Sequence, residues 1–210
     1  MKLYDFSLAP NPRRVRMFLA EKGITVPSVQ INTRQREQFS ESFRKLNPSC
    51  QVPVLELDDG TGIAESVAIC RYFEDLQPEP RLMGRDPKDK AIVEMWNRRA
   101  EIDGFAAVGE AVRNALPMFA DRGLAGVEGG VPQIPALVER GKQTLQRFFQ
   151  RLDTRLAESR FLAGENFTIA DITAFVAIDF AKRVEVEPPA GLTHLGRWLA
   201  EIAARPSAKV

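Results

Sequence analysis

Short apolar strands and amphipathic helices alternate along the first 78 residues. Residues 26–31 alternate apolar and polar positions, which is typical of a strand with one buried face. Val15, Phe18 and Leu19 follow the spacing of a helix that buries one side, and Gly23 is placed to end it. The pattern predicts the element order β-α-β-α-β-β-α. The predicted strands span 3–6, 26–31, 54–57 and 63–64, and the predicted helices span 12–22, 40–46 and 66–76.

The strand pattern ends at a linker over 77–87, which is rich in proline and other turn formers. Beyond the linker only helical patterns remain. The fold class is therefore α+β, with an α/β domain over 1–78 and an all-helical domain over 88–210. The second domain is predicted to contain helices over 88–120, 134–158, 168–182 and 192–204, with a break at Leu116-Pro117 and a glycine-rich loop over 122–133.

Composition then narrows the function. Among 210 residues, Lys and Arg number 29 and Asp and Glu number 28, so the formal net charge is +1. A chain without a positive field is not expected to bind nucleic acid in general. No apolar run reaches the roughly 18 residues of a membrane helix, and the acid at Asp5 is unlike the apolar core of an export signal. We expect a cytoplasmic protein with no nucleic-acid or membrane partner.

The sequence is poor in the residues that usually carry chemistry. His194 is the only histidine, and Cys50 and Cys70 are the only cysteines. They form no CxxC pair and leave no material for a zinc site or a histidine-based triad. We expect no metal. If the protein is an enzyme, its reactive group is expected to come from a bound molecule.

Two short segments combine polar groups with turns. Val52-Pro53 precedes a strand, and a cis peptide there would leave the Val52 backbone free to pair with an extended peptide. An ordinary trans proline at a strand start is the simpler alternative. Glu65-Ser66 opens a helix, where free N–H groups suit a carboxylate and Glu65 suits an ammonium, as at the zwitterionic end of an amino acid. A capping serine beside a solvated glutamate is the alternative there.

A third segment, residues 7–14, turns from a strand into a helix. Asn11 is predicted as the helix N-cap and Pro12 as its first residue. Ser7, Asn11 and the free N–H groups of this helix start are candidates to surround a bound anion, although capping alone would explain Asn11. The Arg13-Arg14-x-Arg16 cluster is most simply the exposed face of the helix.

The order and spacing of five stretches are the most distinctive feature of the chain. They are Lys2-Leu3-Tyr4, Phe18-Leu19-Ala20-Glu21-Lys22-Gly23-Ile24, Val52-Pro53-Val54-Leu55, Glu65-Ser66-Val67-Ala68-Ile69 and Phe167-Thr168-Ile169-Ala170-Asp171. The last of them also predicts a helix capping box with a role in folding. Together they resemble the cytosolic glutathione transferases over essentially the whole chain. The resemblance implies a thioredoxin-like N-terminal domain, a helical C-terminal domain that contributes the second-substrate site, a homodimer, and glutathione as co-substrate.

The resemblance also implies roles for particular positions. Val52-Pro53 matches the family's cis-proline and its backbone contact to the cysteinyl part of glutathione. Glu65-Ser66 matches the pair that binds the γ-glutamyl end. Gln51 stands where members often have a lysine for the glycine carboxylate, and Gln38 matches a further glutathione contact of some bacterial members.

The catalytic position departs from the theta-, zeta- and phi-like classes, because Ala9 stands where they have a serine. Asn11, at the place of the cysteine of beta-like members, resembles the bacterial nu-like group. One hydrogen bond to a charged group contributes roughly 1.5–3 kcal/mol, enough to lower a thiol pKa by one unit. Asn11 is therefore the expected catalytic donor and Ser7 an auxiliary one. The implied function is a detoxifying transferase that directs the glutathione thiolate at a small electrophile, disulfide or peroxide; a non-catalytic binding or regulatory protein is the alternative.

Overall fold

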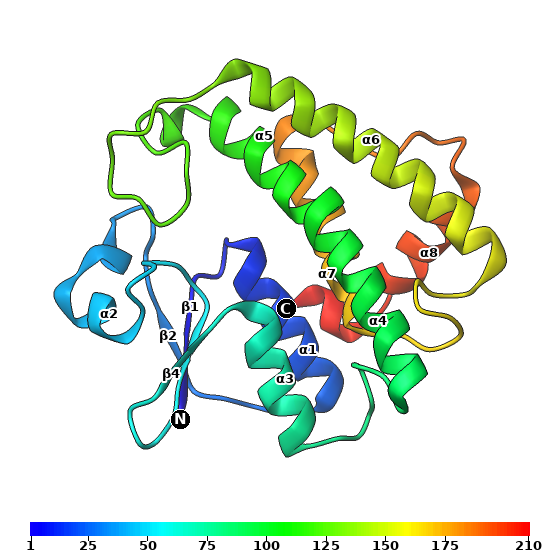
Figure 1. The fold of residues 1–210 in the computed structure, drawn as a ribbon, viewed down its shortest axis with the longest axis horizontal. Helices are drawn as coiled ribbons and strands as arrows, with labels where there is room; N and C mark the ends of the chain where they lie inside the picture. Colours follow the sequence, from blue (N-terminus) through cyan, green and yellow to red (C-terminus); the bar gives the residue numbers. More distant parts are fainter.

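A mixed four-stranded sheet forms the centre of the N-terminal part of the chain (Figure 1). The computed structural model describes all 210 residues. The strand order is β2-β1-β3-β4, with β1 parallel to β2 and with β3 antiparallel to both β1 and β4. Leu3 of β1 pairs with Ser28 on one side and with Leu55 on the other. The strands are β1 (Lys2–Asp5), β2 (Ser28–Gln30), β3 (Val54–Glu56) and β4 (Gly62–Ala64).

The helices of this part complete the order β-α-β-α-β-β-α, which confirms the prediction. α1 and α3 pack against each other, and α3 also contacts β3 and β4. Phe18 of α1 and Ile69 and Phe73 of α3 are buried, because they lie on the apolar sides that the helical spacing predicts. The helices are α1 (Pro10–Lys22), α2 (Glu41–Leu46) and α3 (Ser66–Leu76).

α1 begins two residues earlier than predicted, and Asn11 is not its N-cap. Ala9 is the capping residue, with extended backbone, and Pro10 is the first helical residue. Pro10 and Pro12 are both tolerated, because the first N–H groups of a helix have no partner within the helix to lose. Asn11 therefore lies inside the first turn.

The remainder of the chain is helical, as predicted. The pattern predicted as one helix over 88–120 is a run of three elements, α4, the π-helix η2 and α5, that ends at Ala115. Leu116 has extended backbone, because the ring of Pro117 disfavours a helical conformation at the residue before it. None of the helices combines the length and apolar character that a membrane crossing requires. The elements are α4 (Pro87–Arg99), η2 (Ala100–Ala106), α5 (Ala107–Ala115), α6 (Pro135–Glu158), α7 (Ile169–Ala181) and α8 (Thr193–Ala203).

One hydrophobic core runs through both parts of the chain. Phe18 of α1 belongs to the same buried cluster as Phe148 of α6 and Trp198 of α8. α1 packs against α7, and the C-terminal segment η5 (Pro206–Lys209) returns to lie beside α1 (Figure 1). The two parts cannot separate without exposing this shared core to water.

A buried carboxylate fixes the start of α7. Asp171 accepts hydrogen bonds from the N–H and hydroxyl of Thr168, from the N–H of Leu162 and from Nε1 of Trp198. The predicted capping box is present. Burial raises the pKa of Asp171, and these donors oppose that rise. The carboxylate thus joins α7 to α8 and to the loop before α7, which is a role in folding.

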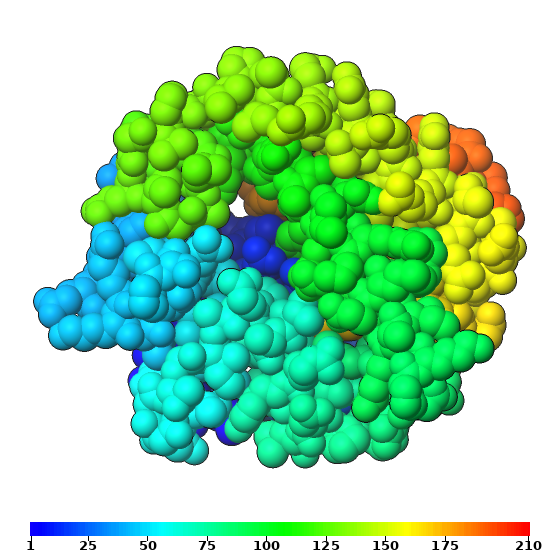
Figure 2. All heavy atoms as spheres, in the orientation of Figure 1, coloured from blue at the N-terminus to red at the C-terminus, as the bar shows by residue number.

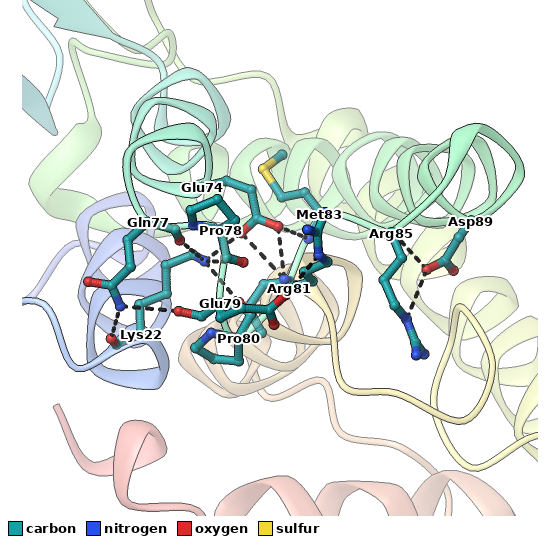
Figure 3. Close-up of polar contacts among 11 residues, drawn as sticks. Lys22, Glu74, Gln77, Pro78, Glu79, Pro80, Arg81, Met83, Arg85 and Asp89 are labelled. Atoms are coloured by element: carbon teal, nitrogen blue, oxygen red, sulfur yellow. Dashed lines mark hydrogen bonds and ion pairs between the residues drawn. The ribbon is translucent and has the colours of Figure 1, made fainter.

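A buried ion pair holds the linker between the two parts (Figure 3). Lys22 at the end of α1 and Glu74 of α3 meet at 2.7 Å, and the Lys22 side chain is 0% exposed. Lys22 Nζ also donates to the carbonyl oxygens of Gln77 and Pro80, both at 2.8 Å. Glu74 in turn accepts from the N–H groups of residues 82 and 83. The course of the linker is therefore set by two charged side chains from the N-terminal part.

Replacing Lys22 with methionine should lower the free energy of unfolding by about 3–5 kcal/mol, because Glu74 would stay buried without a cationic partner. The matched control is Lys45→Met, since Lys45 pairs with Glu41 on the exposed surface of α2, where ion pairs contribute little. The midpoint of urea unfolding measures both effects. Equal midpoints for the two variants would show that the linker does not depend on the pair.

Candidate active site

A cavity of about 270 Å³, called here the central cavity, opens between the N-terminal part and the helical part. Figure 2 shows a hollow near the middle of the molecule, bordered by the start of α1, by α5 and by the loop after α5. Its volume is near the lower end of small-molecule sites, which span roughly 300–1,000 Å³. Its walls come from the β1–α1 turn, from segments on either side of α2, and from α5 with its following loop.

Asn11 brings two free hydrogen-bond donors to the central cavity, which it lines. Pro10 and Pro12 have no N–H, and the N–H of Arg13 is bonded within the turn, so the Asn11 backbone N–H is the free one. Asn11 Oδ1 accepts from Arg14 Nη1 at 3.2 Å. Since arginine has only donors, the amide oxygen must face Arg14, and Nδ2 is left without a partner in the protein.

Arg14 fixes this orientation from a buried position. It is 4% exposed, and its Nη2 donates to Glu101 at 2.6 Å and to the Thr173 hydroxyl at 3.0 Å. Burial lowers the pKa of Arg14 to about 10, so the side chain remains charged at neutral pH. The prediction that the arginine cluster of α1 is an exposed face is wrong for Arg14, because it lies four residues before Phe18 on the buried side of the helix.

Ser66 and Glu65 lie beside Asn11, at the start of α3. The buried Ser66 hydroxyl does not cap α3; it donates to the Asn11 carbonyl at 3.2 Å and so joins the starts of the two helices. The N–H groups of residues 66–68 have no acceptor in the protein, as is usual for a first helical turn. Glu65 is exposed and has φ of +69°, a backbone region that non-glycine residues rarely adopt. Neither residue lines the central cavity itself, but both adjoin it through Asn11.

Unpaired polar groups from two more segments line the central cavity. Neither the N–H nor the C=O of Val52 has a hydrogen-bond partner, and the Val52–Pro53 peptide bond is cis. Gln38 is 7% exposed, and its Oε1 has no partner. Gln51 lines the cavity between them and uses its carbonyl to accept from Asn47. Because buried polar groups are normally paired, this set indicates room for a polar ligand.

Ser7 lies on the other side of the β1–α1 turn. It lines a separate groove of about 880 Å³ between α1, β2 and the C-terminus. Its N–H donates to Gln30 and its carbonyl accepts from Arg16, while its hydroxyl has no partner. The structure therefore does not bring Ser7 to the cavity that Asn11 lines.

Several lining residues were not expected from the sequence. Cys50 is buried, lines the central cavity and has φ of +52°. Arg113 and Arg122 line the helical wall. No signal in the sequence marked these arginines, because the helical pattern reports which residues pack and not which polar side chains meet at a cavity. No cluster of His, Cys, Asp and Glu side chains that could hold a metal ion is present.

Two family models match the chain. Residues 9–76 match the glutathione S-transferase N-terminal domain, and residues 110–206 match the glutathione S-transferase C-terminal domain. Glutathione S-transferase 2 of Saccharomyces cerevisiae is 36% identical over 100% of this chain and 88% of its own length. The crystal structure of a glutathione S-transferase domain-containing protein of Marinobacter aquaeolei VT8 is 42% identical, with a TM-score of 0.90 over 99% of both chains. The crystal structure of Gtt2 from Saccharomyces cerevisiae is 34% identical, with a TM-score of 0.91 over 100% of this chain and 99% of the other.

A thioredoxin-like sheet that meets a helical bundle across a cavity of unpaired polar groups defines a two-domain transferase. The chain belongs to the cytosolic glutathione transferase family and is a glutathione transferase, which agrees with the expectation from its sequence. The family assignment favours an enzyme over the non-catalytic alternative.

Proposed function

We propose that this transferase holds glutathione along the central cavity and activates its thiol at Asn11. The observation that carries the proposal is the convergence of unpaired polar groups from separate segments around one cavity. The free N–H and C=O of Val52 suit the cysteinyl residue of an extended peptide, with Pro53 in cis behind them. Gln38 and Gln51 supply side-chain amides for the glycine end of glutathione.

The γ-glutamyl end is proposed to bind at the start of α3. The free N–H groups of the first turn and the positive end of the helix suit its carboxylate, and Ser66 lies at that point. The Glu65 carboxylate makes no ion pair within the protein and is available to an ammonium group. The Ser66–Asn11 hydrogen bond then sets the distance between the γ-glutamyl end and the thiol.

Activation of the thiol requires only hydrogen bonds. A thiol with a pKa of about 8.5 is only about 3% thiolate at pH 7. Each hydrogen bond to a charged group contributes roughly 1.5–3 kcal/mol, and one pKa unit corresponds to about 1.4 kcal/mol. Asn11 offers both a backbone N–H and Nδ2, which is sufficient without a base. Ser7, the auxiliary candidate from the sequence, lines the other groove and is not included in the proposed thiol site.

The two parts of the chain are proposed to bind different substrates. Residues 1–78 form the glutathione-binding domain, and residues 88–210 supply the site for a small electrophile, disulfide or peroxide. We place this activity in detoxification in the cytoplasm. A homodimer is part of the proposal because the resemblance to the family implies one.

Glutathione-agarose should retain the protein, and at least one of three substrates should be consumed only when glutathione is present. The three are an electrophilic arene, a small dialkyl disulfide and a hydroperoxide, which separate conjugation, disulfide reduction and peroxide reduction. The proposed function would be contradicted if the protein showed none of the three activities, was not retained and gave no thermal shift on adding glutathione.

Asn11→Ala should raise the pKa of the bound glutathione thiol by roughly one unit, because the side-chain donor is removed and the backbone N–H stays. Ultraviolet titration of the thiolate measures the change. Ser7→Ala is the matched control and should leave the titration unchanged, since Ser7 lines the other groove. The same titration curve for Asn11→Ala and the native protein would overturn the role of Asn11.

Glu65→Gly should raise the free energy of unfolding while weakening glutathione binding. Glycine removes a backbone strain of about 1–3 kcal/mol, which exceeds its entropic cost of roughly 0.5–1 kcal/mol. Loss of the carboxylate should weaken glutathione by about tenfold. Glu65→Ala is the matched control, because it loses the carboxylate and keeps the strain. Thermal unfolding and calorimetric titration check both; tight glutathione binding by Glu65→Gly would exclude the ammonium contact.

A further inference from the structure

The central cavity carries a positive charge that the protein does not balance. Four arginines line it and no aspartate or glutamate does; they are Arg34, Arg113, Arg122 and Arg183. The two that are half-buried are held by neutral groups: Arg113 Nη1 donates to the carbonyl oxygens of residues 122 and 124 at 3.2 Å, and Arg122 Nη2 donates to that of Met118 at 3.2 Å. The chain as a whole has a net charge of only +1, so the cavity is an exception on this molecule.

Arg113 and Arg122 share one aromatic ring. Their guanidinium groups lie 4.8 and 5.8 Å from the ring centre of Phe119. Burial lowers the pKa of Arg113, and the neighbouring charge of Arg122 lowers it further. Two like charges therefore lie near one ring without a counter-ion, and a bound anion would relieve both their repulsion and their desolvation.

The wall beside this pair is largely apolar. Phe105, Val108 and Val112 line the same side of the cavity. The loop that carries Arg122 packs closely on the N-terminal part: a Cβ on Gly126, which has φ of +75°, would lie 2.5 Å from the carbonyl oxygen of Ser49. The helical wall thus offers an apolar surface with a cationic end.

We propose that the second substrate of this transferase is an anionic aromatic electrophile. Its carboxylate or sulfonate binds between Arg113 and Arg122, and its ring packs on Phe105 and Val112. This inference rests on the proposed glutathione site, in which the two carboxylates of glutathione lie at the start of α3 and near Gln51.

With an aryl halide as substrate, the reaction is a substitution at the ring carbon. The thiol proton passes to solvent, and the glutathione sulfur attacks the ring carbon that carries the halogen. The carbon–sulfur bond forms, the carbon–halogen bond breaks, and halide leaves. The carboxylate of the substrate is unchanged and serves only for recognition.

A matched pair of probes tests the proposal directly. Nitrobenzoate and its methyl ester, neither of which reacts, are titrated by calorimetry into the protein loaded with glutathione. The acid should bind about tenfold tighter than the ester, because a charge-assisted hydrogen bond to a guanidinium is lost in the ester. Chloronitrobenzoate and its methyl ester, assayed for conjugation, should show the same preference in kcat/KM relative to their uncatalysed rates.

Three variants test whether the preference depends on Arg122. Arg122→Gln should abolish it, Arg122→Lys should keep much of it, and Arg147→Gln should leave it unchanged. Arg147 is exposed on α6 and lines neither the central cavity nor the groove that Ser7 lines, so it controls for the lost charge. The Lys variant preserves charge while losing the planar fork, which separates electrostatics from the loop contact to Met118.

The proposal is overturned if the native protein binds acid and ester equally, if Arg122→Gln keeps the preference, or if Arg122→Gln weakens both probes alike. Titration of glutathione alone is read separately. Failure of that titration would contradict the proposed glutathione site, whereas normal glutathione binding without an acid preference would contradict only the anionic substrate.

Discussion

The burial of opposite charges on Lys22 and Glu74 is the constraint on which the rest of the structure depends. Taking two ions out of water costs several kcal/mol each, and only a full set of partners offsets that cost. Here the partners are the linker's own carbonyl and N–H groups, so satisfying the ions also dictates the path of the chain. The carbonyl of Leu82 then accepts from Ile169 at the start of α7. Since the central cavity has one wall from each part, its shape follows from this junction.

The start of α1 shows how a chain poor in reactive side chains can still activate a thiol. Pro10 and Pro12 remove the backbone donors on either side of Asn11, so the free donors concentrate at one residue. Arg14 turns the Asn11 amide so that its nitrogen is free, and Ser66 holds the Asn11 carbonyl from the other helix. The site therefore depends less on a special side chain than on the exact set of neighbours around an ordinary one.

The order of elements could be predicted because apolar spacing and helix ends are local signals. Gly23 does end α1 in a left-handed conformation, and Pro117 does end α5. The start of α1 was misplaced because Pro10 and Pro12 are both good first-turn residues, and local sequence cannot rank them. The burial of Arg14 could have been predicted from its spacing. It lies four residues before Phe18, which lies four residues before Lys22, and all three are on the buried side of α1.

At the site, too, roles that depend on local structure could be predicted and roles that depend on tertiary packing could not. Val52, Glu65 and Ser66 could be proposed from the sequence because each lies at a strand or helix start, where free backbone groups are expected. The separation of Ser7 from Asn11 depends on which side of a turn each side chain takes, and that is fixed by tertiary packing. Arg113 and Arg122 come together because a glycine-rich loop folds back on α5. The spacing of apolar residues in the sequence does not predict such a contact.

Because four arginines line the central cavity, the charge of the molecule is distributed unevenly. Removing four positive charges from a formal net charge of +1 leaves −3 for all the remaining residues. Beyond a Debye length of about 8 Å at physiological ionic strength, an approaching anion meets a nearly neutral body whose charges are largely screened. Attraction begins only at the mouth of the cavity. Long, densely charged polyanions are thereby discouraged, while a small anion that reaches the opening by diffusion is selected there.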